Sequence, residues 1–218
     1  MRGQDAHTQV AAIYRELGRL GFVPGSAGNV SVRVPDGMAI TPSAVPAKAV
    51  TARSVVALSL EGIVAGAGTP SSEWPMHAAI YRAFPVAGAI VHTHADACTA
   101  VACLNESLPA FHYMIAAFGG DDLRCAPYVT FGTPALARAA VAALRDRRAC
   151  LLANHGMIVH AASADQALTD AIILESLCRQ YLLARAAGAV RVLTPEEMRA
   201  ARRRFETYGP ANASDPDR

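Results

Sequence analysis

Apolar residues near the start of the chain recur with the spacing of one helical face. Val10, Ile13, Tyr14 and Leu17 lie three or four residues apart. This period is typical of an amphipathic helix that packs on a core, and it predicts a helix over residues 5–21.

The pattern then changes to short apolar runs that are separated by turn residues. Pro35-Asp36-Gly37 lies between two such runs, and Glu61-Gly62 lies between two more. Because short turns of this kind connect antiparallel neighbours, the first third of the chain is predicted to form antiparallel sheet. The strands predicted here are residues 30–33, 38–41, 55–60 and 63–64.

From residue 70 onward, helical and strand patterns alternate. A capping side chain followed by proline marks helix starts at Ser71 or Ser72, at Thr133 and at Thr194. The predicted helices are residues 73–83, 134–144, 164–187 and one from 194, and the predicted strands are residues 88–94, 150–153 and 157–160. Since no repeat or linker interrupts this pattern, we expect one catalytic domain over residues 1–210 and a polar, flexible tail over residues 211–218.

The composition of the 218 residues excludes several classes of function. A formal charge of +2 is too small to indicate a nucleic-acid surface. No stretch reaches the roughly 20 uncharged apolar residues of a membrane-spanning helix, and the polar first residues do not resemble a signal peptide. We therefore expect a cytoplasmic protein that binds neither membranes nor nucleic acid.

Histidines at the ends of apolar runs are the candidate chemistry. His92 and His94 end one predicted strand, and residues two apart on a strand point to the same side. His155 follows a second predicted strand, and Glu73 heads a predicted helix. Three neutral imidazoles and a carboxylate form a ligand set that suits zinc, although each histidine alone could be a core residue. His77 is a rival ligand, because it lies four residues after Glu73 on the same helical face.

Longer motifs identify a family to which the chain is similar. They are Gly28-Asn-Val-Ser-Val-Arg33, Ile40-Thr-Pro-Ser43, Ser71-Ser-Glu73, Ile90-Val-His-Thr-His94 and Asn154-His-Gly156. In this order they resemble the class II aldolase/adducin family, over about residues 5–185. The stretches His112-Tyr-Met-Ile-Ala-Ala117, Cys125-Ala-Pro-Tyr128 and Phe131-Gly-Thr133 are similar to its bacterial L-fuculose-phosphate aldolase branch.

The resemblance implies a fold, a site and an assembly. The fold is a three-layer α/β/α domain with a mainly antiparallel central sheet. The resemblance implies one divalent ion, Zn²⁺ or else Mn²⁺ or Co²⁺, held by Glu73, His92, His94 and His155, with His77 left to packing. It also implies that Glu73 leaves the metal to act as base, and that the chain forms a four-fold homotetramer with sites at subunit interfaces. Tyr113 would then reach a neighbouring subunit's site and handle the proton at the aldehyde oxygen.

The family's substrates carry a phosphate, which neutral donors of this chain are expected to bind. The residues matched to this role are Ser26, Gly28, Asn29, Ser43, Ser71 and Ser72. Phe131 is expected to line the aldehyde pocket, with core packing as the alternative, and Tyr208 matches a tail tyrosine of the branch that closes over the substrate. Ala44 departs from the family, which usually has glycine there. If the backbone at Ala44 requires a positive φ, alanine costs about 1 kcal/mol and loosens the phosphate loop.

The implied reaction is retro-aldol cleavage of a ketose 1-phosphate, of the L-fuculose 1-phosphate type, to dihydroxyacetone phosphate and an aldehyde such as lactaldehyde. Such cleavage needs either a lysine Schiff base or a Lewis-acid metal. Lys48 is the only lysine and lies in a loop, so the metal route is favoured. Alternatives are a 5-deoxyribulose or 5-methylthioribulose 1-phosphate aldolase, a ribulose-phosphate 4-epimerase and a methylthioribulose-phosphate dehydratase. A non-catalytic adducin-like module would have lost its metal ligands, which this chain retains.

Overall fold

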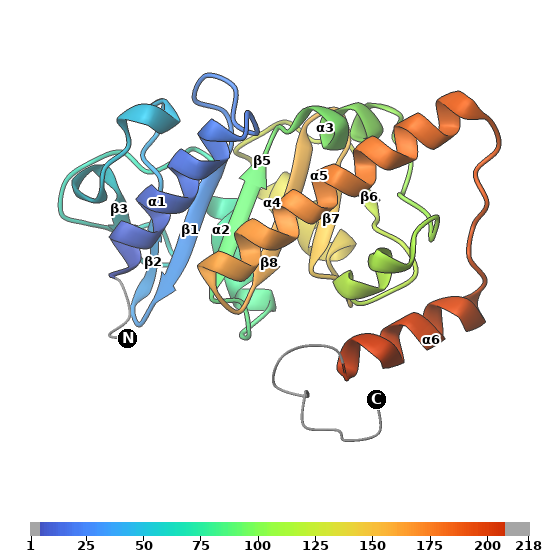
Figure 1. The fold of residues 1–218 in the computed structure, drawn as a ribbon. Helices are drawn as coiled ribbons and strands as arrows, with labels where there is room; N and C mark the ends of the chain where they lie inside the picture. Colours follow the sequence, from blue (N-terminus) through green and yellow to red (C-terminus); the bar gives the residue numbers. More distant parts are fainter. Residues whose placement is uncertain (1–4, 208–218) are drawn as a thin grey trace.

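The computed structural model describes residues 5–207, with a single eight-stranded sheet at its centre (Figure 1). The strand order is β4-β3-β2-β1-β5-β8-β7-β6, and every neighbouring pair is antiparallel apart from β6 and β7. The strands are β1 (Asn29–Val34), β2 (Gly37–Ile40), β3 (Val56–Leu58), β4 (Val64–Ala65), β5 (Ala89–Thr93), β6 (Cys125–Ala126), β7 (Ala149–Leu152) and β8 (Gly156–Ala161). The predicted, mainly antiparallel sheet is thereby confirmed.

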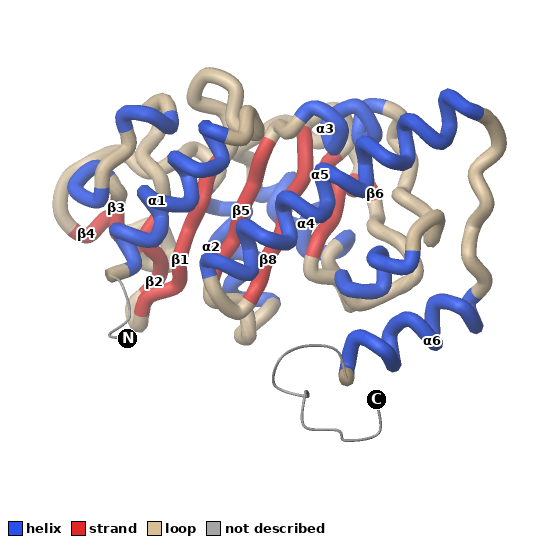
Figure 2. The backbone as a smooth tube through the Cα atoms, viewed as in Figure 1, coloured by secondary structure: helices blue, strands red, loops and turns tan. Residues whose placement is uncertain are grey.

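Helices cover both faces of the sheet and complete three layers (Figure 2). One face carries α1 (Ala6–Arg19), α3 (Asp96–Cys103) and α5 (Ala164–Ala187), and the other carries α2 (Trp74–Ala83) and α4 (Pro134–Ala143). The last helix, α6 (Pro195–Glu206), packs on the short helix η3 (Tyr113–Phe118), and η1 (Ala47–Ala49) and η2 (Ala52–Ser54) lie beside α1.

Two buried apolar clusters, one on each face of the sheet, hold the layers together. Leu17 of α1 and Leu174 of α5 belong to one cluster, and Ile80 of α2 belongs to the other. The adjacent β5 residues Ile90 and Val91 point into different clusters, because side chains alternate along a strand. This alternation sets which residues of the central strands face α2.

Several neighbouring strands of the sheet have one end close together. Asn29, the first residue of β1, pairs with His92 near the end of β5. On the other side of β5, Thr93 pairs with Met157 of β8. Because β7 and β8 are joined by a tight turn at this same end of the sheet, three chain segments that are distant in sequence meet here.

Most sequence-based element predictions are confirmed, and the exceptions have physical reasons. The predicted helix over residues 164–187 coincides with α5, and both predicted hairpins are present. The prediction of the cap of α2 was wrong, because Glu73 rather than a serine occupies the N-cap position. The pattern did not reveal α3, η3 or β6, since α3 is mostly apolar on all sides and the other two are very short.

Two further predictions concern the C-terminal end of the chain and the crossing of a membrane. The predicted tail over residues 211–218 and the domain boundary at residue 210 lie outside the described residues. Within residues 5–207, no helix has the length and apolar character that crossing a membrane requires.

Candidate metal and phosphate site

Strand β5 and the residue that follows it place two of the predicted metal ligands at the end of the sheet where these strand ends meet. His92 is fully buried near the end of the strand, and His94 follows directly after it. Nδ1 of His92 lies 2.8 Å from the carbonyl oxygen of Met157. Because that oxygen can only accept a hydrogen bond, Nδ1 carries the proton and Nε2 of the neutral ring presents a lone pair to the site.

The tight turn between β7 and β8 supplies the third imidazole. Asn154 adopts a left-handed backbone with φ of 54°, which asparagine tolerates better than most residues. A β-carbon at Gly156 would collide with the carbonyl oxygen of Thr93, so only glycine lets the turn approach the end of β5. The ring centroid of His155 consequently lies 4.8 Å from those of both β5 histidines.

Glu73 enters the site from the N-terminus of α2, where it is the N-cap residue. The residue is almost fully buried, at 6% exposure. Oε2 accepts a hydrogen bond of 3.0 Å from Nδ2 of Asn29 and lies 3.0 Å from Nε2 of His92. Oε1 lies 3.5 Å from Nε2 of His155 and has no hydrogen-bond partner among residues 5–207.

The four predicted ligands therefore meet at one point. The candidate ligand atoms of Glu73, His92, His94 and His155 all lie within 4.8 Å of one another. The two Nε2 atoms of the β5 histidines are 3.1 Å apart. Four ligands at about 2.1 Å from a tetrahedral zinc ion would be about 3.4 Å apart, and three of the pairs in the cluster are 3.0, 3.1 and 3.5 Å apart. Since buried acceptor atoms that face one another repel, the donor set fits a divalent cation between them.

The protonation states of the cluster also fit metal binding. Burial lowers the pKa of both His94 and His155 to about 4, so both rings are neutral at neutral pH. Burial acts against the ionised form of Glu73, but the nearby His92 and His155 outweigh it and hold the pKa of Glu73 below its ordinary value. His92 differs: burial favours its neutral form, yet Glu73 outweighs burial and raises the pKa of that ring, so a metal ion that binds here displaces a proton from it. Neutral imidazole and ionised carboxylate are the forms that ligate metals.

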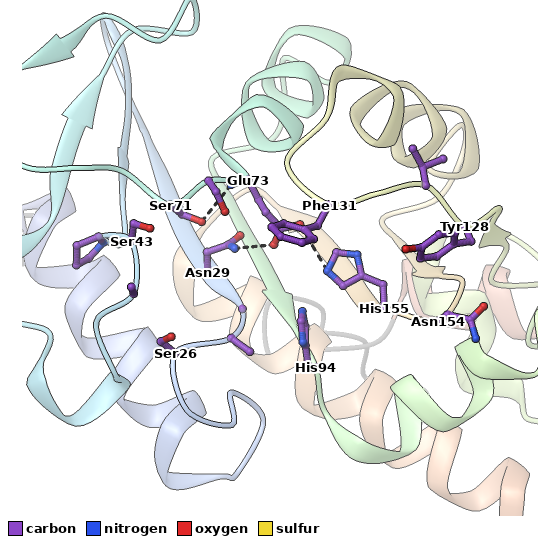
Figure 3. A pocket seen from close by; sticks show the side chains of 16 residues that line it. Ser26, Asn29, Ser43, Ser71, Glu73, His94, Tyr128, Phe131, Asn154 and His155 are labelled. Atoms are coloured by element: carbon purple, nitrogen blue, oxygen red, sulfur yellow. Dashed lines mark hydrogen bonds and ion pairs between the residues drawn. The ribbon is translucent and has the colours of Figure 1, made fainter.

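A cavity of about 430 Å³ opens over the cluster (Figure 3). Glu73, His94 and His155 line it, whereas His92 lies buried beneath. All six residues predicted to bind phosphate line the same cavity, namely Ser26, Gly28, Asn29, Ser43, Ser71 and Ser72. No lysine or arginine of the described chain lines it, so any anion bound here meets hydroxyl and amide groups rather than cationic side chains.

Besides Asn154, two loop residues that line the cavity have left-handed backbones. Gly28 has φ of 75°, and a β-carbon there would lie 2.7 Å from the carbonyl oxygen of His92, so the loop needs glycine to reach β5. Ala44 has φ of 58° and also lines the cavity. The positive φ considered from the sequence is thus present, at a residue whose β-carbon makes it unfavourable.

The three aromatic residues that were predicted for the site do not lie together. Phe131 lines the cavity and is largely exposed, and so is Tyr128, a lining residue that was not predicted from the sequence. Tyr113 lies outside the cavity of its own chain, in a groove between η3 and α6 where its ring stacks on Phe205. Tyr208 lies outside the described residues.

His77 does not join the metal cluster, although it shares a helical face with Glu73. Its ring is fully buried, and Nε2 lies 2.6 Å from Oδ1 of Asn29. The structure thus adds hydrogen bonding to the packing role that the sequence analysis gave this residue.

The chain is similar in sequence to known proteins over most of its length. The model of the Class II Aldolase and Adducin N-terminal domain family matches residues 8–182. The L-fuculose phosphate aldolase of Escherichia coli (strain K12) is 46% identical over 195 residues, which cover 89% of this chain and 91% of that protein. The 5-methylthioribulose-1-phosphate/5-deoxyribulose-1-phosphate aldolase of Rhodospirillum rubrum is 43% identical, covering 89% of this chain and 88% of that one.

A solved structure shows the same fold. The structure of an L-fuculose 1-phosphate aldolase superposes with a TM-score of 0.89 at 37% identity, covering 94% of this chain and 98% of that one. The chain therefore belongs to the class II aldolase/adducin family, whose aldolases are metal-dependent. Within that family it is an enzyme of the lyase class, an aldolase with a cluster of one glutamate and three histidines.

Proposed function

We propose that this aldolase cleaves a ketose 1-phosphate of the L-fuculose 1-phosphate type to dihydroxyacetone phosphate and an aldehyde such as lactaldehyde. The main support for this proposal is that one cavity is lined both by the cluster of Glu73 and histidines and by the predicted phosphate donors. Ser26 and Ser43 lie on one side of the cluster, and Tyr128 lies on the other (Figure 3). A phosphorylated ketose spanning this cavity would place its phosphate at the serines and its aldehyde half at the aromatic side.

We infer that Glu73, His92, His94 and His155 hold one divalent ion, which we take to be zinc, with manganese or cobalt as alternatives. When bound, such an ion supplies a Lewis acid that polarises the substrate carbonyl and accepts the charge developed as the carbon–carbon bond breaks. The three imidazoles, being neutral, add no negative charge that would oppose this effect.

Glu73 is the proposed base. Asn29 donates to Oε2, whereas Oε1 has no hydrogen-bond partner in the described part of the chain, and the side chain lines the cavity. An unpartnered carboxylate oxygen beside the substrate can take the proton from the carbon next to the carbonyl. The low pKa of Glu73 keeps this oxygen unprotonated at neutral pH.

The phosphate is proposed to bind through neutral donors. The backbone N–H groups of Ser43 and Ser71 already donate to the carbonyls of Thr69 and Thr41, so these two serines offer their hydroxyls. Ser72 lies just before α2, where the helix N-terminus favours an anion. Several such donors together can bind a phosphate without a cationic side chain.

We further propose a four-fold homotetramer in which Tyr113 acts in the neighbouring subunit's site. Tyr113 is 54% exposed and faces a groove outside the cavity of its own chain. A phenol in that place can protonate or deprotonate the aldehyde oxygen only at a site built by another subunit.

Mixed assemblies test the tetramer and the role of Tyr113 together. Chains carrying Glu73→Gln and chains carrying Tyr113→Phe should each be nearly inactive alone. After joint refolding in equal amounts, about a quarter of the sites in a cyclic tetramer would combine both native residues, and activity should recover to about that fraction. If mixing restores nothing while both variants remain folded and assembled, Tyr113 does not act across the interface.

The aldehyde half of the substrate decides between two related aldolases. Phe131 and Tyr128 give this end of the cavity an aromatic lining, and small apolar differences there change binding by only about 1 to 3 kcal/mol. A 5-deoxyribulose or 5-methylthioribulose 1-phosphate is therefore the second candidate, supported by the 43% identity with the Rhodospirillum rubrum aldolase.

A direct assay compares zinc-loaded protein on these ketose 1-phosphates, with dihydroxyacetone phosphate measured through a coupled reductase. Release from L-fuculose 1-phosphate at the highest kcat/KM supports the main proposal. Isomer exchange without release would instead indicate a 4-epimerase, and loss of water from the substrate would indicate a dehydratase. All five cysteines are free thiols, which fits the reducing cytoplasm that we propose as its location.

A further inference from the structure

A buried polar row connects β1 to α2 behind the catalytic cluster. Asn29 and Ser31 lie two residues apart on one face of β1, while Glu73, His77 and Tyr81 lie four residues apart on one side of α2 and its N-cap. Two strand residues advance about 6.8 Å and four helical residues about 6 Å, so the two rows stay in register. None of these five residues is more than 6% exposed.

Four consecutive hydrogen bonds link the members of this row. The hydroxyl oxygens of Tyr81 and Ser31 are 2.9 Å apart, and Oγ of Ser31 lies 2.7 Å from Nδ1 of His77. Nε2 of His77 lies 2.6 Å from Oδ1 of Asn29. Nδ2 of Asn29 then donates to Oε2 of Glu73 over 3.0 Å.

The direction of each bond follows from the carboxylate at the end of the row. Ionised Glu73 only accepts, so the amide nitrogen of Asn29 must face it and the amide oxygen must face His77. That oxygen also only accepts, which places a proton on Nε2 of His77 and, in a neutral ring, leaves Nδ1 as an acceptor. Ser31 therefore donates to Nδ1, and the Tyr81 hydroxyl donates to Ser31. Every donor in the row points toward Glu73.

We propose that His77 is a positioning residue for Glu73, acting through Asn29. Its Nε2–H holds the Asn29 amide in the one orientation that donates to Oε2, which leaves Oε1 free for metal binding and proton transfer. Without that donor the amide could turn over and present its carbonyl to the carboxylate, where two acceptors would repel. Since hydrogen bonds in series strengthen one another in a low-dielectric interior, the hydroxyls of Ser31 and Tyr81 reinforce this orientation. This role rests on the proposed function of Glu73 and assigns no contact with substrate.

The tautomer of His77 gives a test that needs no activity. In the zinc-loaded, ¹⁵N-histidine-labelled protein, nitrogen and proton resonances of His77 should show a protonated Nε2, an unprotonated Nδ1 and a proton that exchanges slowly with solvent. The resonance is assigned by its loss in His77→Gln. A ring protonated at Nδ1 alone would overturn the proposal, because Asn29 would then have no donor to orient it.

A matched pair of variants separates positioning from packing. In His77→Gln the amide nitrogen can reach the place of Nε2 and still donate to Asn29. In His77→Asn the shorter amide reaches only the place of Nδ1, so the bond to Ser31 is kept and the donor to Asn29 is lost. We expect His77→Gln to stay within about threefold of the native zinc affinity and kcat, and His77→Asn to lose about 10- to 100-fold in one or both.

Zinc affinity is measured by competition with a chelator, so it is independent of any substrate. If both variants change zinc affinity and kcat equally at equal thermal stability, the proposal is overturned. Such a result is what a role in packing alone would give. If neither variant folds, the tautomer in the native chain decides. Failure of the native enzyme on every ketose 1-phosphate would refute the proposed function, whereas zinc affinity and the tautomer would still test the row.

Discussion

Replacing Ala44 by glycine should stabilise the folded enzyme. Ala44 has φ of 58°, the left-handed conformation in which a β-carbon crowds the backbone. Relief of that crowding is worth roughly 1–2 kcal/mol, and the greater freedom of glycine in the unfolded chain takes back about 0.4–1 kcal/mol. The expected net gain is about 0.5–1 kcal/mol, which for a chain of this size raises Tm by about 1–4 °C.

The same substitution should also affect phosphate binding, because Ala44 lines the cavity beside Ser43. A loop that holds its conformation without strain should bind the phosphate group more tightly, by the same free energy in the substrate complex and in the transition state. We therefore expect KM for the ketose 1-phosphate to fall, by up to about threefold, with kcat unchanged.

The control is Ala67→Gly, at an exposed loop alanine whose backbone φ is not positive. Here glycine brings only its entropy cost, so Tm should fall by about 1–4 °C. Thermal unfolding followed by circular dichroism compares the two variants with the native chain. If Ala44→Gly lowers Tm as much as the control does, the left-handed alanine stores no strain and the reasoning fails.

Three other substitutions test the site. His94→Ala should lose the metal and nearly all turnover, measured as metal content per subunit and release of dihydroxyacetone phosphate; full activity of a metal-free preparation would rule out the mechanism. Glu73→Gln should retain part of the metal yet fail to exchange a proton of dihydroxyacetone phosphate with solvent, and undiminished exchange would identify another base. Burial lowers the pKa of His77 to about 3. Below pH 6.5 the unfolded chain therefore binds a proton at this residue that the folded chain does not bind, so the free energy of unfolding decreases as the pH is lowered. From pH 7 to pH 5 this loss is about 2 kcal/mol, and it should be absent in His77→Gln. Urea unfolding at both pH values checks it, and equal losses in the two proteins would contradict the assignment.

The sequence by itself determined the features that depend on local signals. The helix over residues 164–187 and the capping side chain of Thr194 were predicted where the structure has them, since caps and helical period act within a few residues. The spacing of His92 and His94, with the quoted motifs, was enough to predict the ligand set whose side chains the structure brings together.

Only the tertiary structure decided how distant segments combine. The partner of His77 is Asn29, which lies 48 residues away and meets it because β1 and α2 share a face. The left-handed backbone of Ala44 and the position of Tyr113 outside its own cavity likewise depend on how loops and helices pack around the sheet. Residue type and period limit what each segment can form, but the direction of a hydrogen bond or the sign of φ is fixed only when another part of the chain occupies the space beside it.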